Sequence, residues 1–464
     1  MRLLVAAAFA AFALSSCAAL EPKEKPEAAV RINEDPYPST YVRYPGVPTV
    51  IRHATLFDGV GGRIGNGTVV MADGVIQAIG GPDVRSPPGA LEIDGTGKFV
   101  SPGIIDIHSH LGDYPSPGVE ANSDGNEATD PVHPDVWAEH SVWPQDPGFS
   151  RALVNGGVTT LQILPGSADL FGGRSVVLKN VPGRTVQEMK FPGAPYGLKM
   201  ACGENPKRVF GSKGNMPSTR MGNIALARET WMKAVAYKKK WDDYEAKGGD
   251  MPERDASMDT LKAVLEGKIL VQNHCYRADE MANMIDMSKE FGYHIAAFHH
   301  AVEAYKIADL LRENNICAVM WADWYGFKME AYDAIPQNIA LVQNAGACAM
   351  VHSDDPNGIQ RLNQAAAKAL AAGQRAGIPN LTEAVGWEWL TSNPAKALGI
   401  FDKTGSLKAG KMADVVLWNG DPFSVYSRPE RVWIDGAEMY DMNDPHKRPV
   451  SDFELGQPGE GDVK

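Results

Sequence analysis

The chain has 464 residues, of which 44% are hydrophobic and 22% are charged, so it can form one large globular domain and a smaller one. Its formal net charge is −12, and residues 237–240 contain its one short basic run. This balance argues against nucleic acid and anionic lipid as partners and favours a small-molecule or short-peptide substrate.

The N-terminus has the pattern of a secretory signal. A basic start precedes an apolar run over residues 3–14, which is too short to span a bilayer but has the length of a signal-peptide core. The string LSSC, ending at Cys17, resembles the lipobox of bacterial lipoproteins, so residues 1–17 are predicted to be a signal peptide and lipobox. A lipid on Cys17 would be the only membrane attachment, and Ala18 favours a periplasmic or outer-membrane lipoprotein. An ordinary secretory signal is the alternative, and it also predicts export.

Both ends of the remaining chain differ from its middle in composition and in the pattern of hydrophobic residues. Residues 18–48 are predicted to be a flexible tether, because they are rich in Pro, Glu and Lys and lack a hydrophobic period. Short β-rich segments with glycine turns follow over residues 49–100 and return over 404–450. We expect these two segments to form one small β-sandwich domain, followed by a tail over residues 451–464.

The middle of the chain, residues 101–403, alternates apolar strand-like runs with amphipathic helical stretches such as 277–291 and 302–314. This alternation is typical of a parallel sheet built from βα units. Eight candidate strands can be counted, at residues 103–107, 158–164, 175–178, 197–201, 269–273, 293–298, 316–321 and 347–352. The predicted fold is therefore α/β, a TIM-like (β/α)8 barrel. Long insertions at 111–145 and 206–266 are expected to lie over the active-site mouth.

Four cysteines follow Cys17, namely Cys202, Cys275, Cys317 and Cys348. Each lies in or beside a predicted core strand, where a small buried hydrophobic side chain is the commoner role. No disulfide is predicted.

The most informative string is SPGIIDIHSH, which ends at His110. Residues two apart in a strand project to the same face, so His108 and His110 can hold one metal ion inside the barrel. The string closely resembles the PGxIDxHxH signature of the metal-dependent amidohydrolase superfamily, including its imidazolonepropionase-like and Xaa-Pro dipeptidase-like members. The resemblance covers nearly the whole mature chain, to the string GKMADVV over residues 410–416.

That resemblance implies further ligands at the ends of later strands. His274 ends the fifth predicted strand, and His300 ends the sixth, where choosing it over His299 rests on the resemblance alone. The family's SD pattern places the catalytic aspartate at Asp354, with Asp355 as the rival. A lone buried histidine is usually a hydrogen-bonded core residue and a strand-end aspartate often a helix cap, but such residues at the ends of correctly ordered strands indicate a site.

At the fourth strand, two residues remain as alternative candidates for the metal ligand. Lys199 lies where many family members use a carboxylated lysine to bridge two metals, whereas Glu204, five residues later, resembles the glutamate of some deacetylase relatives. A surface lysine and a loop glutamate are the structural alternatives for these two residues. The predicted metal ligands are thus His108, His110, Lys199, His274, His300 and Asp354, with Glu204, His299 and His352 as alternative metal or substrate contacts.

The resemblance also implies the chemistry. The expected cofactor is Zn²⁺ or another divalent transition metal, two per chain, with Asp354 as general base. The expected reaction is hydrolysis of an amide or cyclic amide bond, on peptides or N-acyl amino acids. A deaminase or imidazolonepropionase-like ring opener is the alternative enzyme, and a noncatalytic metal-stabilised surface binding module is the alternative from another class. Members of the family are often dimers or tetramers, so the resemblance makes a homo-oligomer a candidate state for this chain. Aromatic residues after the seventh strand, such as Trp321 and Trp324, either line the substrate pocket or pack.

Overall fold

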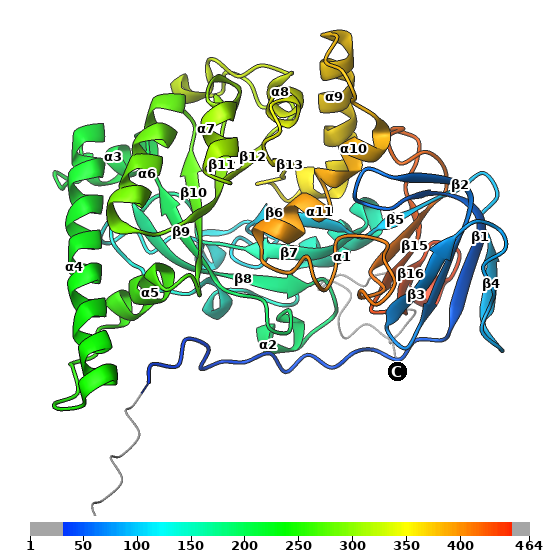
Figure 1. The fold of residues 1–464 in the computed structure, drawn as a ribbon, viewed down its shortest axis with the longest axis horizontal. Helices are drawn as coiled ribbons and strands as arrows, with labels where there is room; N and C mark the ends of the chain where they lie inside the picture. The colour runs from blue at the N-terminus through cyan, green and yellow to red at the C-terminus, as the bar shows by residue number, and fades with distance from the viewer. Residues whose placement is uncertain (1–30, 448–464) are drawn as a thin grey trace, which may run out of the picture.

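Two eight-stranded sheets organise the chain (Figure 1). The structure, a computed structural model, describes residues 31–447. The predicted signal peptide and lipobox at 1–17, the first part of the tether and the tail at 451–464 therefore lie outside the described residues. The domain boundaries expected from the sequence stay predictions.

All eight predicted barrel strands are present and neighbour one another in chain order. They are β6 (Ile104–Ser109), β7 (Val158–Ile163), β8 (Phe171–Lys179), β9 (Gly197–Ala201), β10 (Leu270–Cys275), β11 (Ile295–His300), β12 (Cys317–Met320) and β13 (Ala349–Val351). The first and last strands, β6 and β13, are not paired with each other in the described part of the chain. Asp354 N–H donates to His108 O across that gap at 3.1 Å, so the barrel is nearly closed.

One strand departs from the expected parallel arrangement. β8 runs antiparallel to both β7 and β9, whereas the other neighbouring strands are parallel. Residues 164–170 connect β7 to β8 without a helix, and a parallel crossover needs a dozen or more residues. The expectation of a wholly parallel barrel was wrong at this strand.

Helices pack around the barrel and extend it on one side. They are α1 (Pro147–Gly156), α2 (Val186–Met189), α3 (Glu204–Gly211), α4 (Arg220–Lys247), α5 (Ala256–Leu265), α6 (Ala278–Phe291), α7 (Ala308–Glu313), α8 (Asn338–Asn344), α9 (Leu362–Arg375), α10 (Glu383–Glu388) and α11 (Ser392–Ala397). Single 3-10 turns are η1 (Glu120–Asn122), η2 (Ala138–His140), η3 (Ala304–Lys306), η4 (Met329–Ala331), η5 (Gly358–Arg361) and η6 (Pro445–Lys447). The helix predicted over 277–291 matches α6, whereas the one predicted over 302–314 divides into η3 and α7.

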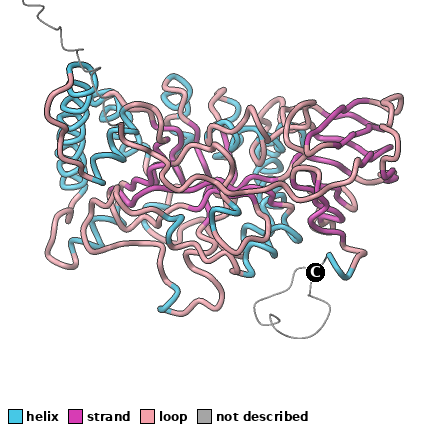
Figure 2. The backbone as a smooth tube through the Cα atoms, turned by 90° about the horizontal axis from the view of Figure 1, so that it is seen from below, coloured by secondary structure: helices cyan, strands magenta, loops and turns pink. Residues whose placement is uncertain are grey.

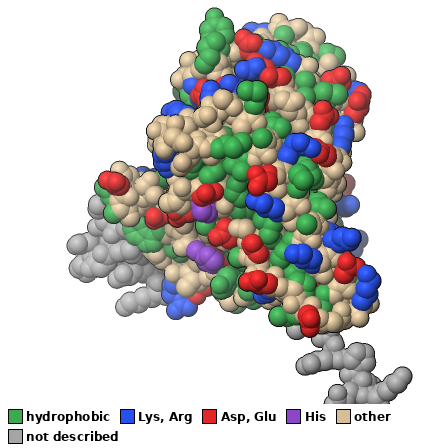
Figure 3. Space-filling view, turned by 90° about the vertical axis from the view of Figure 1, so that its left-hand side faces the viewer, with side chains coloured by type: hydrophobic (Ala, Val, Ile, Leu, Met, Phe, Trp, Pro, Cys, Tyr) green, Lys and Arg blue, Asp and Glu red, His purple; other side chains and the backbone are tan. Residues whose placement is uncertain are grey.

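The second long insertion builds the outer side of the molecule. Its helix α4 packs on α3, α5 and α6 and lies at the edge of the fold in Figure 1, away from the barrel axis. On that side, acidic and basic side chains are interspersed (Figure 3). The expectation that 206–266 covers the barrel mouth therefore fails for α4.

The second sheet joins strands from both ends of the described chain. Its strands are β1 (Thr49–Phe57), β2 (Arg63–Ala72), β3 (Val75–Gly80), β4 (Leu91–Asp94), β5 (Phe99–Pro102), β14 (Val415–Trp418), β15 (Pro429–Ile434) and β16 (Ala437–Asp441). β5 pairs antiparallel with β14, so the early and late segments share one sheet at one end of the molecule (Figure 2). The expected chain-end sandwich is not confirmed, because these strands pair into a single sheet.

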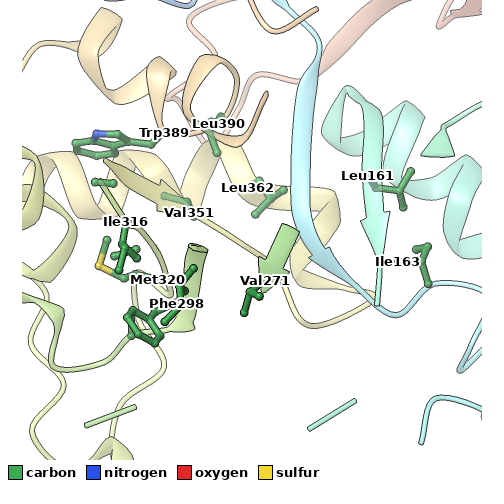
Figure 4. Close-up of a cluster of buried hydrophobic side chains, with 14 of the residues drawn as sticks. Leu161, Ile163, Val271, Phe298, Ile316, Met320, Val351, Leu362, Trp389 and Leu390 are labelled. Atoms are coloured by element: carbon green, nitrogen blue, oxygen red, sulfur yellow. The ribbon is translucent and has the colours of Figure 1, made fainter. Parts of the chain in front are cut away.

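Apolar side chains fill the space between the barrel strands and the covering helices. Figure 4 shows part of this core, in which Leu161, Val271 and Phe298 come from strands and Leu362 comes from α9. All four side chains are buried. Burying both faces of the strands explains why they read as continuous apolar runs in the sequence.

Residues 31–48, the described part of the expected tether, lie extended beneath the barrel (Figure 1). Thr40 N–H donates to Gln187 O at 3.0 Å, and Lys190 Nζ lies 2.8 Å from Asp35 Oδ1. Tyr41 Oη donates to Asp435 Oδ2 at 2.6 Å. These contacts attach the segment to the folded body.

Two disulfides join neighbouring barrel strands, Cys202 to Cys275 and Cys317 to Cys348. The prediction of no disulfide was wrong. Cys202 and Cys275 lie one position after a registered pair of adjacent parallel strands, and Cys317 and Cys348 lie one position before one, with Cα atoms 5.3 and 4.5 Å apart. Side chains at the same level of parallel strands point the same way, so the register brings each pair within bonding distance.

Within residues 31–447, none of the helices combines the length and the apolar composition needed to cross a bilayer.

Candidate metal centre

His108 and His110 stand at the end of β6, where their rings enter the barrel. Their Nε2 atoms lie 3.3 and 3.1 Å from the same oxygen, Asp354 Oδ1. His110 Nδ1 is 2.8 Å from Leu164 O, which makes Nδ1 the donor and leaves Nε2 facing the centre. The alternation of a strand thus places both imidazoles on one carboxylate, as the HxH spacing predicted.

Asp354 follows β13 with a positive φ of 55°, a conformation that non-glycine residues adopt at a cost. Burial opposes its ionisation, but its interactions with the nearby imidazoles of His110, His300 and His352 outweigh this and lower its pKa below the ordinary value. Its rival Asp355 faces elsewhere, since its carboxylate accepts the backbone N–H groups of Asn357 and Gly358. The structure therefore brings Asp354, and not Asp355, to the histidines.

Three more histidines complete the cluster. His300 ends β11 with a φ of 69°, and its ring centroid lies 4.4 Å from that of His274 and 5.0 Å from that of His352. Both ring nitrogens of His274 and His352, and Nδ1 of His300, are buried without a hydrogen-bond partner among the described residues. Burial lowers the pKa of all three, so their imidazoles are neutral and offer lone pairs.

His299 is arranged differently from His300. Its Nδ1 is 2.8 Å from His108 Nδ1, and its Nε2 is 2.8 Å from Gln272 Oε1. Both ring nitrogens of His299 are thus engaged within the barrel, which fits a residue that orients His108 better than a ligand.

Lys199 and Glu204, the open alternatives from the fourth strand, occupy different places. Lys199 lies in β9 with its side chain fully buried, and its Nζ is 3.5 Å from His108 Nε2. Burial lowers the pKa of Lys199 to about 7. Glu204 begins α3 and lies farther out, with Oε1 3.5 Å from Lys328 Nζ. The cluster therefore contains Lys199, whereas Glu204 belongs to the pocket wall.

The cluster fits a divalent metal. Two overlapping groups, His108 with His300 and His352, and His108 with His110 and Asp354, have ligand atoms within 4.8 Å of one another. Neutral imidazoles and an ionised carboxylate are ligands of Zn²⁺ and related metals. The unpartnered buried nitrogens support this fit, because such groups are costly unless something binds them.

The sequence offered no reason to assign a role to Asp106, whose carboxylate is hydrogen-bonded to residues next to the metal cluster. Its Oδ1 accepts from His108 N–H at 3.2 Å and from Ser353 N–H at 3.3 Å, and its Oδ2 accepts from the Ser353 hydroxyl. Asp106 thus ties β6 to the chain after β13, where Asp354 follows. Its position in the sequence, two residues before His108 in the same buried strand, could have indicated this role.

A pocket of about 360 Å³ opens onto the cluster. Its lining consists of Ser167, Glu204, Asn205, Arg208, His274, Tyr276, His300, Phe327, Lys328 and Asp354. The sequence did not indicate Arg208, Phe327 and Lys328, because the insertion and the loop after β12 that contain them carry no motif. Tyr276, the other aromatic member, directly follows β10. The first turns of α3 do reach the pocket, so the second insertion contributes to the site at its beginning only.

Trp321, one of the aromatic residues whose role was open, packs directly on the cluster. Its ring stacks on His300 with centroids 4.2 Å apart, and its Nε1–H donates to Ser353 O at 3.2 Å. Trp324 stacks on Trp321 in turn and is 37% exposed. Trp321 therefore holds the His300 ring in place, and Trp324 extends the aromatic surface outward.

Residues 99–439 match the sequence model of the amidohydrolase family. Amidohydrolase tasK of Hapsidospora irregularis is 32% identical over 449 residues, which is 88% of this chain but 45% of that relative. The chain thus spans less than half of the length of this curated relative. Imidazolonepropionase of Mesorhizobium japonicum is 24% identical over 413 residues, covering 79% of this chain and 90% of that enzyme.

Solved structures agree with this fold. An amidohydrolase from Thermotoga maritima MSB8 has a TM-score of 0.77 and 36% identity, covering 85% of this chain and all of that one. A prolidase complexed with N-methylphosphonate-L-proline has a TM-score of 0.51 and 17% identity, covering 84% of this chain and 99% of that one, and it bears on the fold alone.

Proposed function

The chain belongs to the amidohydrolase family, and on that premise we propose that it hydrolyses an amide bond in a peptide-like or N-acyl amino acid substrate. Members of this family are enzymes that act on carbon–nitrogen bonds and are typically metal-dependent. A noncatalytic binding module is thereby set aside. The substrate class, the metal and the roles of individual residues are parts of the proposal.

One observation carries the proposal: His108 and His110 converge on a single oxygen of Asp354, at 3.3 and 3.1 Å, at the base of a pocket. A site built only for structure would pair these buried groups with one another. Here several buried imidazole nitrogens have no hydrogen-bond partner within residues 31–447, and the rings of His274 and His352 both lie against that of His300.

The proposed ligands are His108, His110, Lys199, His274, His300 and Asp354, with His352 as an alternative. A bound Zn²⁺ or similar divalent ion would supply a water of lowered pKa and a polarised substrate carbonyl. Asp354 is the general base, because its carboxylate is kept ionised and would take a proton at Oδ1 from the attacking water and give it to the leaving nitrogen. His299 holds the ring of His108 in orientation through the contact between their Nδ1 atoms.

Lys199 is the proposed bridge between two metals. Its burial leaves much of the amine unprotonated near neutral pH, and this is the form that reacts with carbon dioxide to give a carbamate. The experiment is elemental analysis of purified wild type beside Lys199→Ala and Glu204→Ala. We expect two metals in wild type and in Glu204→Ala, and one or none in Lys199→Ala. One metal in all three proteins would reject the bridge.

Hydrolysis itself is tested with metal-loaded protein and a panel of N-acetyl amino acids, dipeptides and cyclic amides, following release of amine or ring opening. We expect turnover of the acyclic amides. Turnover of cyclic amides alone would favour the imidazolonepropionase-like alternative. The similarity to the Mesorhizobium enzyme is the observation that supports this alternative. Release of ammonia from aminated rings alone would favour a deaminase.

Export is also part of the proposal. Two disulfides within residues 31–447 support it, because such bonds persist mainly in oxidising compartments. Attachment through a lipid on Cys17 is tested by labelling cells with a radioactive fatty acid, comparing wild type with Cys17→Ala.

A further inference from the structure

The pocket has two chemically different ends. Its inner end is formed by the candidate metal cluster, with His274, His300 and Asp354 in the wall. Its other end holds two cationic side chains, Arg208 of α3 and Lys328 of the loop after β12. A substrate bound at the cluster therefore shares the pocket with two cationic side chains.

Lys328 is held in a defined position. Its Nζ lies 3.5 Å from Glu204 Oε1, 3.1 Å from Asn205 Oδ1 and 3.9 Å from the centroid of the Tyr276 ring. Its side chain is largely buried. The lysine is thus fixed between one carboxylate and an aromatic face, with its charge directed at the pocket.

Arg208 is the charge that remains unbalanced. It lies one helical turn after Glu204 on α3, yet Glu204 pairs with Lys328 instead. Within residues 31–447, the exposed Arg208 guanidinium makes no ion pair or hydrogen bond with another side chain, and it lines the same pocket as Lys328. Because Glu204 is engaged by Lys328, the Arg208 guanidinium is available to an anionic group that enters the pocket.

We propose that Arg208, with Lys328 beside it, binds a carboxylate group of the substrate while the scissile amide lies at the histidine and aspartate end. This inference rests on the proposed function for the position of the amide. It narrows the substrate class to N-acyl amino acids or short peptides with a free carboxylate. The cavity volume of about 360 Å³ suits a molecule of dipeptide size.

The first test measures binding without any carbon–nitrogen bond to cleave. The probes are 3-phenylpropionate and 3-phenylpropanol, which share their size and ring and differ in charge. Calorimetry on the metal-loaded full chain compares wild type with Arg208→Met and with Lys207→Met, a matched control on the neighbouring cation, which does not line the pocket. We expect Arg208→Met to weaken binding of the acid about 10- to 100-fold and to leave the alcohol unchanged.

Three results would overturn the inference: no preference of wild type for the acid, equal weakening by Lys207→Met, or an unchanged affinity in Arg208→Met. The last result would mean that the acid binds the metal instead. Because neither probe is a substrate, the outcome does not depend on the proposed hydrolysis.

The second test measures kcat/KM for N-acetyl-L-phenylalanine and its primary amide. We expect wild type to prefer the free acid at least tenfold, and Arg208→Met to lose that preference mainly through KM. Turnover of both compounds at equal efficiency would retain the hydrolase and reject the carboxylate subsite. Turnover of neither, with the acid still bound through Arg208, would reject the proposed reaction on these compounds and retain the subsite.

Discussion

Asp354 is the residue on which the proposed chemistry depends most directly. Replacing it by Asn keeps the shape of the side chain but removes the proton acceptor, so we expect kcat to fall by about 10²- to 10⁴-fold. Circular dichroism and thermal unfolding should show a folded protein. The control is Asp355→Asn, whose carboxylate accepts only backbone N–H groups of the following turn among the described contacts. Equal turnover in wild type and Asp354→Asn would contradict the assignment.

Asp169 makes a separate prediction about pH. Its side chain is 1% exposed, and neither carboxylate oxygen has a hydrogen-bond partner among the described residues. Burial, together with repulsion from Glu127 and Asp130, raises its pKa to about 7. The folded state therefore keeps this proton while the unfolded state has already lost it, so the residue lowers stability progressively as pH rises from about 4 to about 7.

The isosteric change Asp169→Asn removes this ionisation. We expect the variant to match wild type near pH 4 and to be more stable by up to about 4 kcal/mol at pH 8, since the pKa is raised by about three units and each unit corresponds to about 1.4 kcal/mol. Urea unfolding at both pH values measures the difference. A variant that is less stable than wild type at pH 8 would show that the ionised carboxylate has a partner of its own.

At the scale of elements, the two disulfides tie adjacent barrel strands. Cys202 and Cys275 are 73 residues apart and Cys317 and Cys348 are 31 apart, so each bond closes a long loop. Loop closure predicts that removing either bond costs about 4 kcal/mol, slightly more for the longer loop. Urea unfolding of Cys202→Ser/Cys275→Ser and Cys317→Ser/Cys348→Ser measures the loss. Peptide mapping without reduction should first recover both pairs, and free thiols at these four positions would remove the basis of the prediction.

The barrel strands could be predicted because each is an apolar run bounded by turns. Their direction could not be predicted from that pattern, because a strand buried on both faces has the same composition whichever way it runs. The short connection before β8 contained the missing signal. The cysteine pairs were missed for a related reason: pairing depends on the register of neighbouring strands, and register is a property of two strands together.

At the candidate metal centre too, features of a single strand could be predicted and features that depend on distant segments could not. His108 and His110 are two residues apart in one strand, so their convergence follows from local geometry. The resemblance supplied His274, His300 and Asp354, and the structure brings them to the same place. Arg208 and Lys328 were not predicted, because they line the same pocket only through the packing of an insertion against a distant loop.

At the scale of the whole molecule, a buried ionic cluster connects the barrel, the second sheet and the segment before it. Lys179, at the end of β8, is fully buried, and its Nζ lies 3.4 Å from Asp414 Oδ1 and 3.0 Å from Asp435 Oδ2. The Thr404 hydroxyl donates to Asp414 Oδ2 at 2.7 Å, and Tyr41 donates to Asp435. One lysine of the barrel thus pairs with two carboxylates that lie next to strands of the second sheet.

Replacing Lys179 by Met leaves both carboxylates buried without a cation. Breaking one partner from a buried pair typically costs about 3 to 5 kcal/mol, so we expect a loss of that size in the free energy of unfolding at pH 8. Burial and the neighbouring Asp414 already raise the pKa of Asp435, and without the lysine the folded state gains still more from binding a proton. The loss should therefore shrink as pH falls toward 5.

Lys233→Met is the matched control, because Lys233 and its partner Glu229 are both more than half exposed and such pairs contribute little. Urea unfolding of wild type and both variants at pH 5 and pH 8 gives the four differences needed. If Lys179→Met loses no more stability than Lys233→Met at pH 8, the barrel and the second sheet are held together by apolar packing and by the contacts of residues 31–48 instead. A loss that is equal at both pH values would assign the effect to lost packing of the lysine chain rather than to its charge.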